Sequence, residues 1–519
     1  MKKSSFIYGT ILLVIVNFLV RSLGFIYRIM LSRLIGAEAI GLYQMVFPFL
    51  MLLTTVTTAG IPIAVSSLVA KENSLNNREG VYKVLTIALC IGGTLSLIIS
   101  ILVSLNIDFI ITKILKNKSI YYPFLFTIPA ISLITFSGIL RGFFYGLKDV
   151  SPPANAQIVE QLIRIIFVLS YLVYKKPSNP ILAATIGIIG VSLGEIFGLI
   201  YLVFKFNFKK LNPKKHFLKV YSTSSFKVAG NILYISIPIT IGKLVSVLIQ
   251  TANSILIPQR LIIAGYTSSE AIQTFGKITG MTMPLLFLPF TVTSALAVNI
   301  IPDISEQIAI NNMEDIRSQS NLAIKLTLLV AIPITFVYAI FGNHIAQLIY
   351  NQQDVGKYLT IASYSTIFLC MQHTLSGILH GMGKQVINTI NYLLGILIQL
   401  YCTYFLIPNP RYGINGFFIG YILSAFVIFM LNMITLKGII DMRFSIIKSS
   451  VKATICSIFM IILMFYSYKT SFLITNSNLL STLLATLLGF ILYLVLLSIT
   501  GALDIRPIIK NIPSLKSQI

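Results

Sequence analysis

Charged residues are scarce in this sequence of 519 residues, and acidic residues are the scarcer kind. Asp, Glu, Lys and Arg make up only 10% of the chain, whereas a soluble domain carries about a quarter. Apolar residues reach 56%, and the mean hydropathy is +0.89. This composition excludes an ordinary soluble protein and indicates a protein that is embedded in a membrane.

Cysteine and recognisable catalytic motifs are lacking as well. The cysteines lie singly in apolar segments, without a CxxC pair or metal-ligand spacing, so we expect small buried residues. His373 and His380 have no carboxylate nearby, which favours polar packing, with a titratable gate as the alternative. Because no Walker loop, GxSxG, HExxH or paired-acid motif is present, we expect no catalytic residue, no metal and no cofactor, and hence no enzyme. The four cysteines are Cys90, Cys370, Cys402 and Cys456.

Apolar runs of about twenty residues recur along the whole chain, and each can cross a bilayer as a helix. We therefore predict an all-α polytopic membrane protein with about fourteen transmembrane helices. The first run imitates a signal peptide, but it is too long and is interrupted by Arg21 and Arg28, so we expect no cleavage. The predicted spans are 6–32, 41–69, 82–104, 120–146, 155–174, 181–204, 229–252, 277–300, 322–342, 358–380, 386–407, 415–436, 450–468 and 480–500.

The excess of basic residues, a formal charge of +24, lies mostly in the loops between these spans. If the N-terminus is cytoplasmic, most Lys and Arg fall on the inner side, as the positive-inside rule requires. We therefore expect both termini in the cytoplasm. The positive charge then serves topology and contact with anionic lipid headgroups rather than nucleic acid. The most basic loop carries Lys205, Lys209, Lys210, Lys214, Lys215, Lys219 and Lys227.

An internal repeat is visible in the sequence. The hexapeptide SGILRG at 137–142 recurs as SGILHG at 376–381, and GIIG at 187–190 matches GING at 413–416 at a similar offset. Six helices therefore repeat as the next six, and an axis along the membrane normal relates the two copies. Two such lobes around a central cavity are typical of alternating-access transporters, for which a monomer suffices. The predicted parts are an N-terminal lobe at 1–204, a basic cytoplasmic loop at 205–228, a C-terminal lobe at 229–436, and two further helices with a cytoplasmic tail at 437–519.

A few charges fall inside the predicted spans. Each costs about 2.5–3.5 kcal/mol at the centre of a transmembrane helix, so each needs a reason. Arg21 and Arg28 lie two turns apart on one face of the first span, and Gly24 leaves room there for a ligand or a neighbouring helix. Glu160 and Arg164 are spaced to pair along their own helix.

The seventh span has a polar face with Lys243, Gln250 and Asn253, the predicted counterpart of the Arg21 face. Arg141 closes the first copy of the hexapeptide, where we expect it to meet an entering ligand or to anchor the helix at the headgroups. Acids are too few to neutralise every intramembrane cation, so surplus positive charge is left. Because guanidinium groups bind phosphate through two parallel hydrogen bonds, we expect these residues to line a cavity for an anionic, phosphate-bearing substrate.

Three stretches carry a resemblance to known proteins: RSLGFIYRIMLSRLIGAEAIGLYQMVFPF, TTAGIPIAVSSLVAKE and SGILRGFFYGLKDVSPPANAQIVEQLIRI. They resemble the stage V sporulation protein B group, in the polysaccharide-exporter branch of the multidrug/oligosaccharidyl-lipid/polysaccharide flippase superfamily, to which lipid II flippases also belong. The resemblance implies fourteen helices, a V-shaped cavity between two lobes, and a bacterial cytoplasmic membrane. It also implies flipping of polyprenyl-pyrophosphate-linked glycans, most closely a lipid II-type peptidoglycan precursor of the cell wall or spore cortex, and a cavity role for Arg21.

Three alternatives remain open at this point. A cation-coupled multidrug exporter would share the fold but should place acids in its cavity, and Glu160 and Glu195 are the acids available to bind a coupling ion. A flippase for another polyprenyl-linked glycan, such as a teichoic or capsular unit, fits the sequence too. A scaffold that recruits cell-wall synthesis enzymes has no need of Arg21 and Arg28 inside the bilayer.

Overall fold

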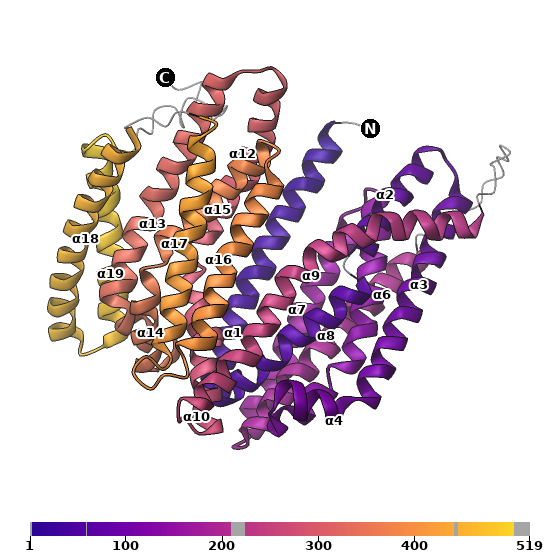
Figure 1. Ribbon diagram of the computed structural model, residues 1–519, viewed down its shortest axis with the longest axis horizontal. Helices are drawn as coiled ribbons and strands as arrows, with labels where there is room; N and C mark the ends of the chain where they lie inside the picture. The colour runs from indigo at the N-terminus through magenta and orange to yellow at the C-terminus, as the bar shows by residue number, and fades with distance from the viewer. Residues whose placement is uncertain (1–2, 59, 209–223, 441–444, 503–519) are drawn as a thin grey trace. The chain divides into compact units, whose positions relative to one another are not determined.

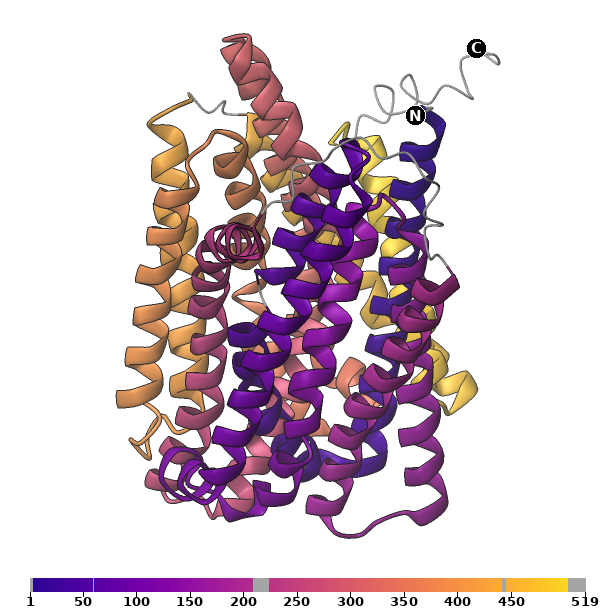
Figure 2. The ribbon, with the colours of Figure 1, turned by 90° about the vertical axis from the view of Figure 1, so that its right-hand side faces the viewer.

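The computed structural model describes residues 3–58, 60–208, 224–440 and 445–502. Every secondary-structure element in these ranges is a helix, and the ribbon shows no strand in either view (Figure 1, Figure 2). The predicted all-α class is therefore confirmed. The chain forms two compact units, Met1–Ile262 with Tyr266–Gly280, and Ile263–Gly265 with Met281–Ile519.

The first unit contains the helices up to α10. They are α1 (Lys3–Thr58), α2 (Ile61–Ser74), α3 (Arg78–Leu105), α4 (Ile107–Phe109), α5 (Tyr121–Leu125), α6 (Ile128–Gly146), α7 (Ser151–Lys175), α8 (Pro180–Phe208), α9 (Ser225–Ile263) and α10 (Ser268–Gly276). The second unit contains α11 (Met283–Leu286), α12 (Phe290–Ala309), α13 (Met313–Tyr350), α14 (Gln353–Ser363), α15 (Thr366–Gly381), α16 (Gln385–Phe405), α17 (Asn415–Lys437), α18 (Ser445–Thr475) and α19 (Asn478–Ile499).

Eleven helices of the described chain are long and apolar enough to cross a membrane, or up to twelve if the bent pair Ser268–Leu286 and Phe290–Ala309 is one span. The expected number of fourteen is not confirmed. Two predicted spans, 6–32 and 41–69, overlap one candidate, Phe18–Ser74, which begins within the first of them. Inside it Gly36 has the non-helical φ 76° and ψ 176°, which glycine adopts without a steric penalty, so two helices meet there at a kink between the two predicted spans. The predicted span 358–380 is divided between α14 and α15, each of which is too short alone.

The repeated hexapeptide packs helices closely in both units. In α6, a methyl group at Gly142 would lie 2.4 Å from the carbonyl oxygen of Pro62 in α2. In α15, a methyl group at Gly377 would lie 2.9 Å from the Cβ of Ala297 in α12. Small residues spaced by four let two membrane helices approach this closely. Each copy of the hexapeptide therefore lies near the end of its helix, and its glycines face an earlier helix of the same unit, α2 for α6 and α12 for α15.

The wider packing of these two helices is also alike. The helix α6 packs against α2, α3 and α8, whereas α15 packs against α12, α13 and α17 (Figure 1). The order of these neighbours along the chain agrees with the repeat read from the sequence. The helix α9 contributes Val228 and Ile232 to the apolar core of the first unit. The predicted lobe boundaries at 204 and 229 stay a prediction.

Three of the four cysteines are buried as expected, namely Cys370, Cys402 and Cys456. The prediction is wrong for Cys90, which is exposed on α3. An exposed side chain of a membrane-spanning helix can face lipid as well as a polar cavity, and a thiol is apolar enough for contact with lipid. Hydropathy alone does not separate the two environments, because lipid and protein core select the same residue types.

Candidate functional site

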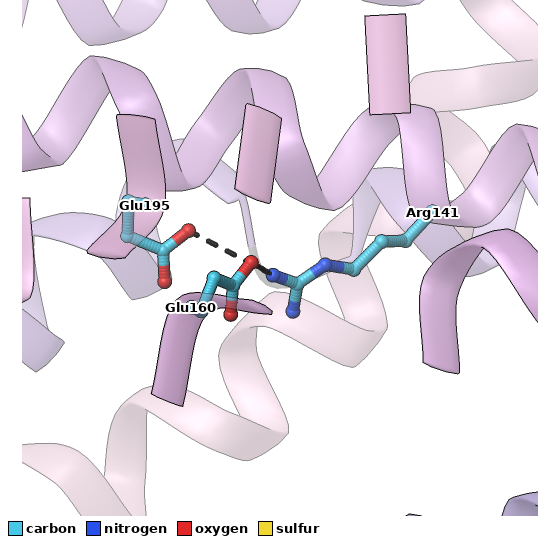
Figure 3. Close-up of polar contacts among 3 residues, drawn as sticks. All are labelled: Arg141, Glu160 and Glu195. Atoms are coloured by element: carbon cyan, nitrogen blue, oxygen red, sulfur yellow. Dashed lines mark hydrogen bonds and ion pairs between the residues drawn. The ribbon is translucent and has the colours of Figure 1, made fainter. Parts of the chain in front are cut away.

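Three charged side chains from three helices of the first unit meet in what we term the charge cluster: Arg141, Glu160 and Glu195. Arg141 of α6 extends toward α7, and its Nη2 donates to Oε1 of Glu160 (Figure 3). The same Nη2 lies 3.8 Å from Oε2 of Glu195 on α8. The side chains are 20%, 9% and 12% exposed, respectively. One cation therefore faces two carboxylates in a largely enclosed place.

A row of glycines on α8 positions Glu160. Gly190, Gly194 and Gly198 recur at every fourth residue and face α7. A methyl group at Gly198 would lie 2.3 Å from Oε1 of Glu160, and one at Gly194 would lie 2.8 Å from its carbonyl oxygen. Only glycine leaves space at Gly198, so the carboxylate lies against bare backbone one turn from Glu195.

The expected pairing of Glu160 with Arg164 is wrong. Glu160 pairs with Arg141 instead, and the described residues include no ion pair between Glu160 and Arg164. The stem of Arg164 lies over the glycine row, where its Cγ would be 3.5 Å from a methyl group at Gly190. Its Nε is buried without a hydrogen-bond partner in the described part of the chain. Glu160 thus pairs with an arginine of a neighbouring helix and not with the arginine four residues away on its own helix.

The arginines of α1 have different surroundings. Arg21 is exposed and Arg28 is half-buried, and among the residues described neither forms an ion pair with a carboxylate. Gly24 faces α7, since a methyl group there would lie 3.7 Å from Nε2 of Gln161. The room beside the two arginines is therefore taken by a neighbouring helix at Gly24. Gln161 is buried, and the sequence interpretation missed it because a lone glutamine gives no signal.

The residues predicted on the seventh span lie on α9, which belongs to the first unit. Lys243 and Gln250 are exposed, whereas Oδ1 of Asn253 is buried without a partner among the described atoms. Beside them, Thr251 donates to the carbonyl oxygen of Pro48 at 3.2 Å and ties α9 to α1. The predicted cavity residues thus all occur in one unit, and Arg141 and Glu160 are in direct contact there.

The second copy of the hexapeptide has neutral partners. His380, at the position equivalent to Arg141, has its Nε2 3.1 Å from Nδ2 of Asn388 on α16. Asn388 also donates to Ser376 at 2.8 Å and accepts from Asn432 of α17 at 3.0 Å. His373 stacks on Phe290, with ring centroids 5.8 Å apart. In the described ranges, no group of three His, Cys, Asp or Glu side chains could hold a metal ion.

Comparisons with known proteins agree with this architecture. The sequence matches the family described as Polysaccharide biosynthesis protein over residues 6–308, and the family described as MatE over residues 244–405. Stage V sporulation protein B of Bacillus subtilis (strain 168) is 28% identical over 450 residues, 86% of each chain. Lipid II flippase MurJ of the same organism is 23% identical over 76% of each chain.

A solved structure, lipid II flippase MurJ in an inward closed conformation, matches with a TM-score of 0.71. The identity is 17%, over 96% of this chain and 100% of the other. At this identity the match concerns the fold, which is that of an all-helical transporter. The resemblance to the stage V sporulation protein B group, and with it to the flippase superfamily, is therefore confirmed.

Proposed function

The chain belongs to the polysaccharide biosynthesis protein family, and we propose on this premise that it moves an anionic lipid-linked glycan across a membrane. The substrate that fits best is a polyprenyl-pyrophosphate-linked precursor of the lipid II type, for cell wall or spore cortex. Movement would follow alternating access rather than catalysis, in line with relatives that are flippases. The pyrophosphate and glycan need a polar path, whereas the polyprenyl tail can stay in the lipid.

Arg21 and Arg28 carry this proposal. Both lie in an apolar helix, where each charge costs about 2.5–3.5 kcal/mol, and neither has an acid partner among the described residues. Arg141, by contrast, is neutralised by Glu160 and lies near Glu195. The uncompensated positive charge of the first unit thus includes two guanidinium groups on one face of α1. Guanidinium is the group best suited to hold phosphate oxygens in pairs.

The proposal extends to location and partners. We place the protein in the bacterial cytoplasmic membrane with both termini in the cytoplasm, because this orientation puts the basic loop at 205–228 inside. The partners are the lipid-linked glycan and the bilayer, with cell-wall synthesis enzymes as further candidates. A monomer is sufficient for alternating access between two lobes.

Complementation tests the proposal in cells. A strain depleted of its own lipid II flippase is made to express the native chain, Arg21→Ala, Arg21→Lys or the control Arg411→Ala, with membrane levels measured for each. Arg411 is exposed in the loop before α17, and its replacement by Ala removes one positive charge, as Arg21→Ala does. We expect rescue by the native chain and the control, and none by Arg21→Ala. Rescue by all variants would make Arg21 structural, and failure of the native chain would remove lipid II from the candidate substrates.

A second candidate function, cation-coupled drug export, is favoured by the MatE match over residues 244–405. Such a transporter needs acids that are available to a cation, and Glu160 and Glu195 are the acids in the charge cluster. Glu160 is already bonded to Arg141, which speaks against this function. Increased efflux of a cationic dye from cells expressing the chain, abolished by Glu195→Gln, would favour the exporter instead.

A further inference from the structure

The second unit contains a cavity of about 230 Å³ between α12, α15 and α16. This volume exceeds that of a single water, which occupies about 30 Å³ in the liquid, and is smaller than a pocket for a drug-sized ligand, about 300–1,000 Å³. It suits one six-membered ring. The side chains that line it include Phe290, Gln372, His373, Ser376, Asn388 and Tyr392.

Two polar atoms of this lining have no partner. Oε1 of Gln372 and Nδ1 of His373 are buried and make no hydrogen bond within the described chain. Both residues line the cavity, and since an unsatisfied buried polar atom costs about 1–3 kcal/mol, a ligand that reaches these atoms on entering the cavity would be favoured. The third polar group, Asn388, is instead held fixed by Ser376, His380 and Asn432. The cavity thus combines the fixed amide of Asn388 with Gln372, whose Oε1 is unpaired, and His373, whose ring also hydrogen-bonds with the backbone of Thr293.

The chemistry of the lining selects the ligand. None of the side chains reported around the cavity is a carboxylate, lysine or arginine, which disfavours both an anion and a metal cation. Phe290 and Tyr392 provide aromatic rings, and His373 stacks on Phe290. A sugar ring matches this combination, because its C–H groups pack on aromatic faces while its hydroxyls donate to and accept from amide and imidazole groups.

We propose that this cavity binds one uncharged sugar ring of the transported glycan. The inference rests on the proposed function, which supplies a glycan as substrate, and it adds where a neutral part of that glycan is recognised. The proposal also gives a reason why the second copy of the hexapeptide carries His380 where the first copy carries Arg141. With His380 in place of an arginine, the surroundings of Asn388 remain hydrogen-bonding but carry no guanidinium.

The absence of tryptophan from the whole chain makes a direct binding test possible. Tyr392→Trp keeps an aromatic ring at the cavity and introduces a single tryptophan, which can be excited at wavelengths that the other tyrosines do not absorb. In this background, purified protein is titrated with N-acetylglucosamine, glucose or galactose, and with inorganic pyrophosphate. We expect a saturable change in emission with at least one sugar and none with pyrophosphate.

The matched pair Gln372→Leu and Gln399→Leu shows whether the response comes from the cavity. Both glutamines lie in the second unit, but only Gln372 lines the cavity, whereas Gln399 is buried elsewhere on α16. We expect sugar affinity to fall about tenfold or more in Gln372→Leu and to stay unchanged in Gln399→Leu. Thermal unfolding of both variants checks that they are folded.

A transport experiment distinguishes failure of the sugar site from failure of the proposed function. Vesicles containing the native chain, Gln372→Leu or Gln399→Leu are tested with polyprenyl pyrophosphate alone and with the same lipid bearing a disaccharide. If Gln372→Leu loses transport of the glycan-bearing lipid but still transports polyprenyl pyrophosphate, the result supports the sugar site. Transport that is unaffected in Gln372→Leu, or emission that responds to no sugar, overturns the site while the proposed function stands. Sugar binding without movement of either lipid would overturn the function instead.

Discussion

Arg21 and Arg141 are both arginines in apolar helices, yet their electrostatic surroundings are opposite. Arg141 has a bonded carboxylate from Glu160 and a second one, Glu195, 3.8 Å away. Arg21 has no ion-pair partner among the described residues. A charge neutralised by its own protein contributes little to holding an external anion. Arg141 thus contributes to the packing of the first unit, whereas the α1 arginines are the ones that we propose for contact with the substrate.

The charge cluster predicts an asymmetry between its members. Glu160→Gln leaves Arg141 with Glu195 as a remaining acid, whereas Arg141→Leu leaves two carboxylates in an enclosed place with no bonded cation. Removing one partner of a buried ion pair costs about 3–5 kcal/mol when nothing replaces it. We expect Arg141→Leu to lower the free energy of unfolding by about 3–5 kcal/mol, and Glu160→Gln to lower it by less than half as much.

Thermal unfolding of the purified protein in detergent measures both variants, and the double variant Arg141→Leu with Glu160→Gln completes the cycle. Neutralising one acid should recover part of the loss in Arg141→Leu. Equal destabilisation by both single variants, or no recovery in the double variant, would contradict the arrangement in Figure 3.

At this scale the sequence revealed the charges but not their partners. The spacing of Glu160 and Arg164 predicts a pair on one helix, and both residues do lie in α7. Which acid meets which base depends on how α6, α7 and α8 are rotated about their axes, and no residue spacing records that rotation. Gln161 and the unpartnered atoms of Gln372 and His373 were beyond prediction for the same reason.

Among the elements, α8 and α17 show how the repeat serves packing. Gly190, Gly194 and Gly198 of α8 are matched in α17 by Gly416, Gly420 and Ser424 at the same spacing. A methyl group at Gly420 would lie 2.5 Å from the Cβ of Cys402 in α16, just as the α8 glycines receive α7. Small residues at every fourth position are thus a packing surface in both units. In α8 the last of them also leaves space for a charged side chain.

The closeness of α7 and α8 gives an element-scale prediction. Gly198→Ala places a methyl group 2.3 Å from Oε1 of Glu160, so the carboxylate must leave Arg141 or the helices must separate. Overpacking of this kind costs about 1–3 kcal/mol, and the disturbed ion pair adds to it. We expect a lower unfolding temperature in detergent for Gly198→Ala.

Two variants make this result specific. Shortening the acid in Gly198→Ala with Glu160→Asp should restore part of the stability, because the shorter side chain makes room for the methyl group. Gly230→Ala is the matched control, since a methyl group at this helical glycine meets no atom within 4 Å. It should leave stability unchanged or raise it by about 0.5–1 kcal/mol. Tolerance of Gly198→Ala equal to that of Gly230→Ala would contradict the close packing.

Element boundaries were predictable only where the sequence marks them. The long apolar runs lie in helical segments, because burial in lipid or protein requires the same composition, but some runs are divided between consecutive helices. The division of the predicted span 358–380 between α14 and α15 was not predicted, although the polar run SYST at 363–366 coincides with the break. The break between the predicted spans 6–32 and 41–69 was predictable, because it contains Gly36, whose non-helical backbone separates two helices at a kink.

Over the whole molecule, two units repeat one packing scheme with different chemistry. The first unit contains a charged set of residues, with Arg141 on the first copy of the hexapeptide. The second contains a neutral network around His380 and Asn388, beside a cavity without charged lining. A substrate with an anionic pyrophosphate and a neutral glycan has the same two kinds of chemistry. The repeat was readable in the sequence, whereas the neutral cavity required the structure.

The most direct measurement of the central claim is transbilayer movement in vesicles that contain only the purified chain. The substrate is a fluorescent polyprenyl-pyrophosphate-linked disaccharide, and an impermeant reagent reports how much of it has reached the outer leaflet. Native protein and the exposed control Lys175→Ala should move it at the same rate. Arg21→Ala with Arg28→Ala should be at least tenfold slower, because each lost charge-assisted hydrogen bond is worth about 1.5–3 kcal/mol. Movement at the native rate without both arginines, or no movement by the native chain, would contradict the account.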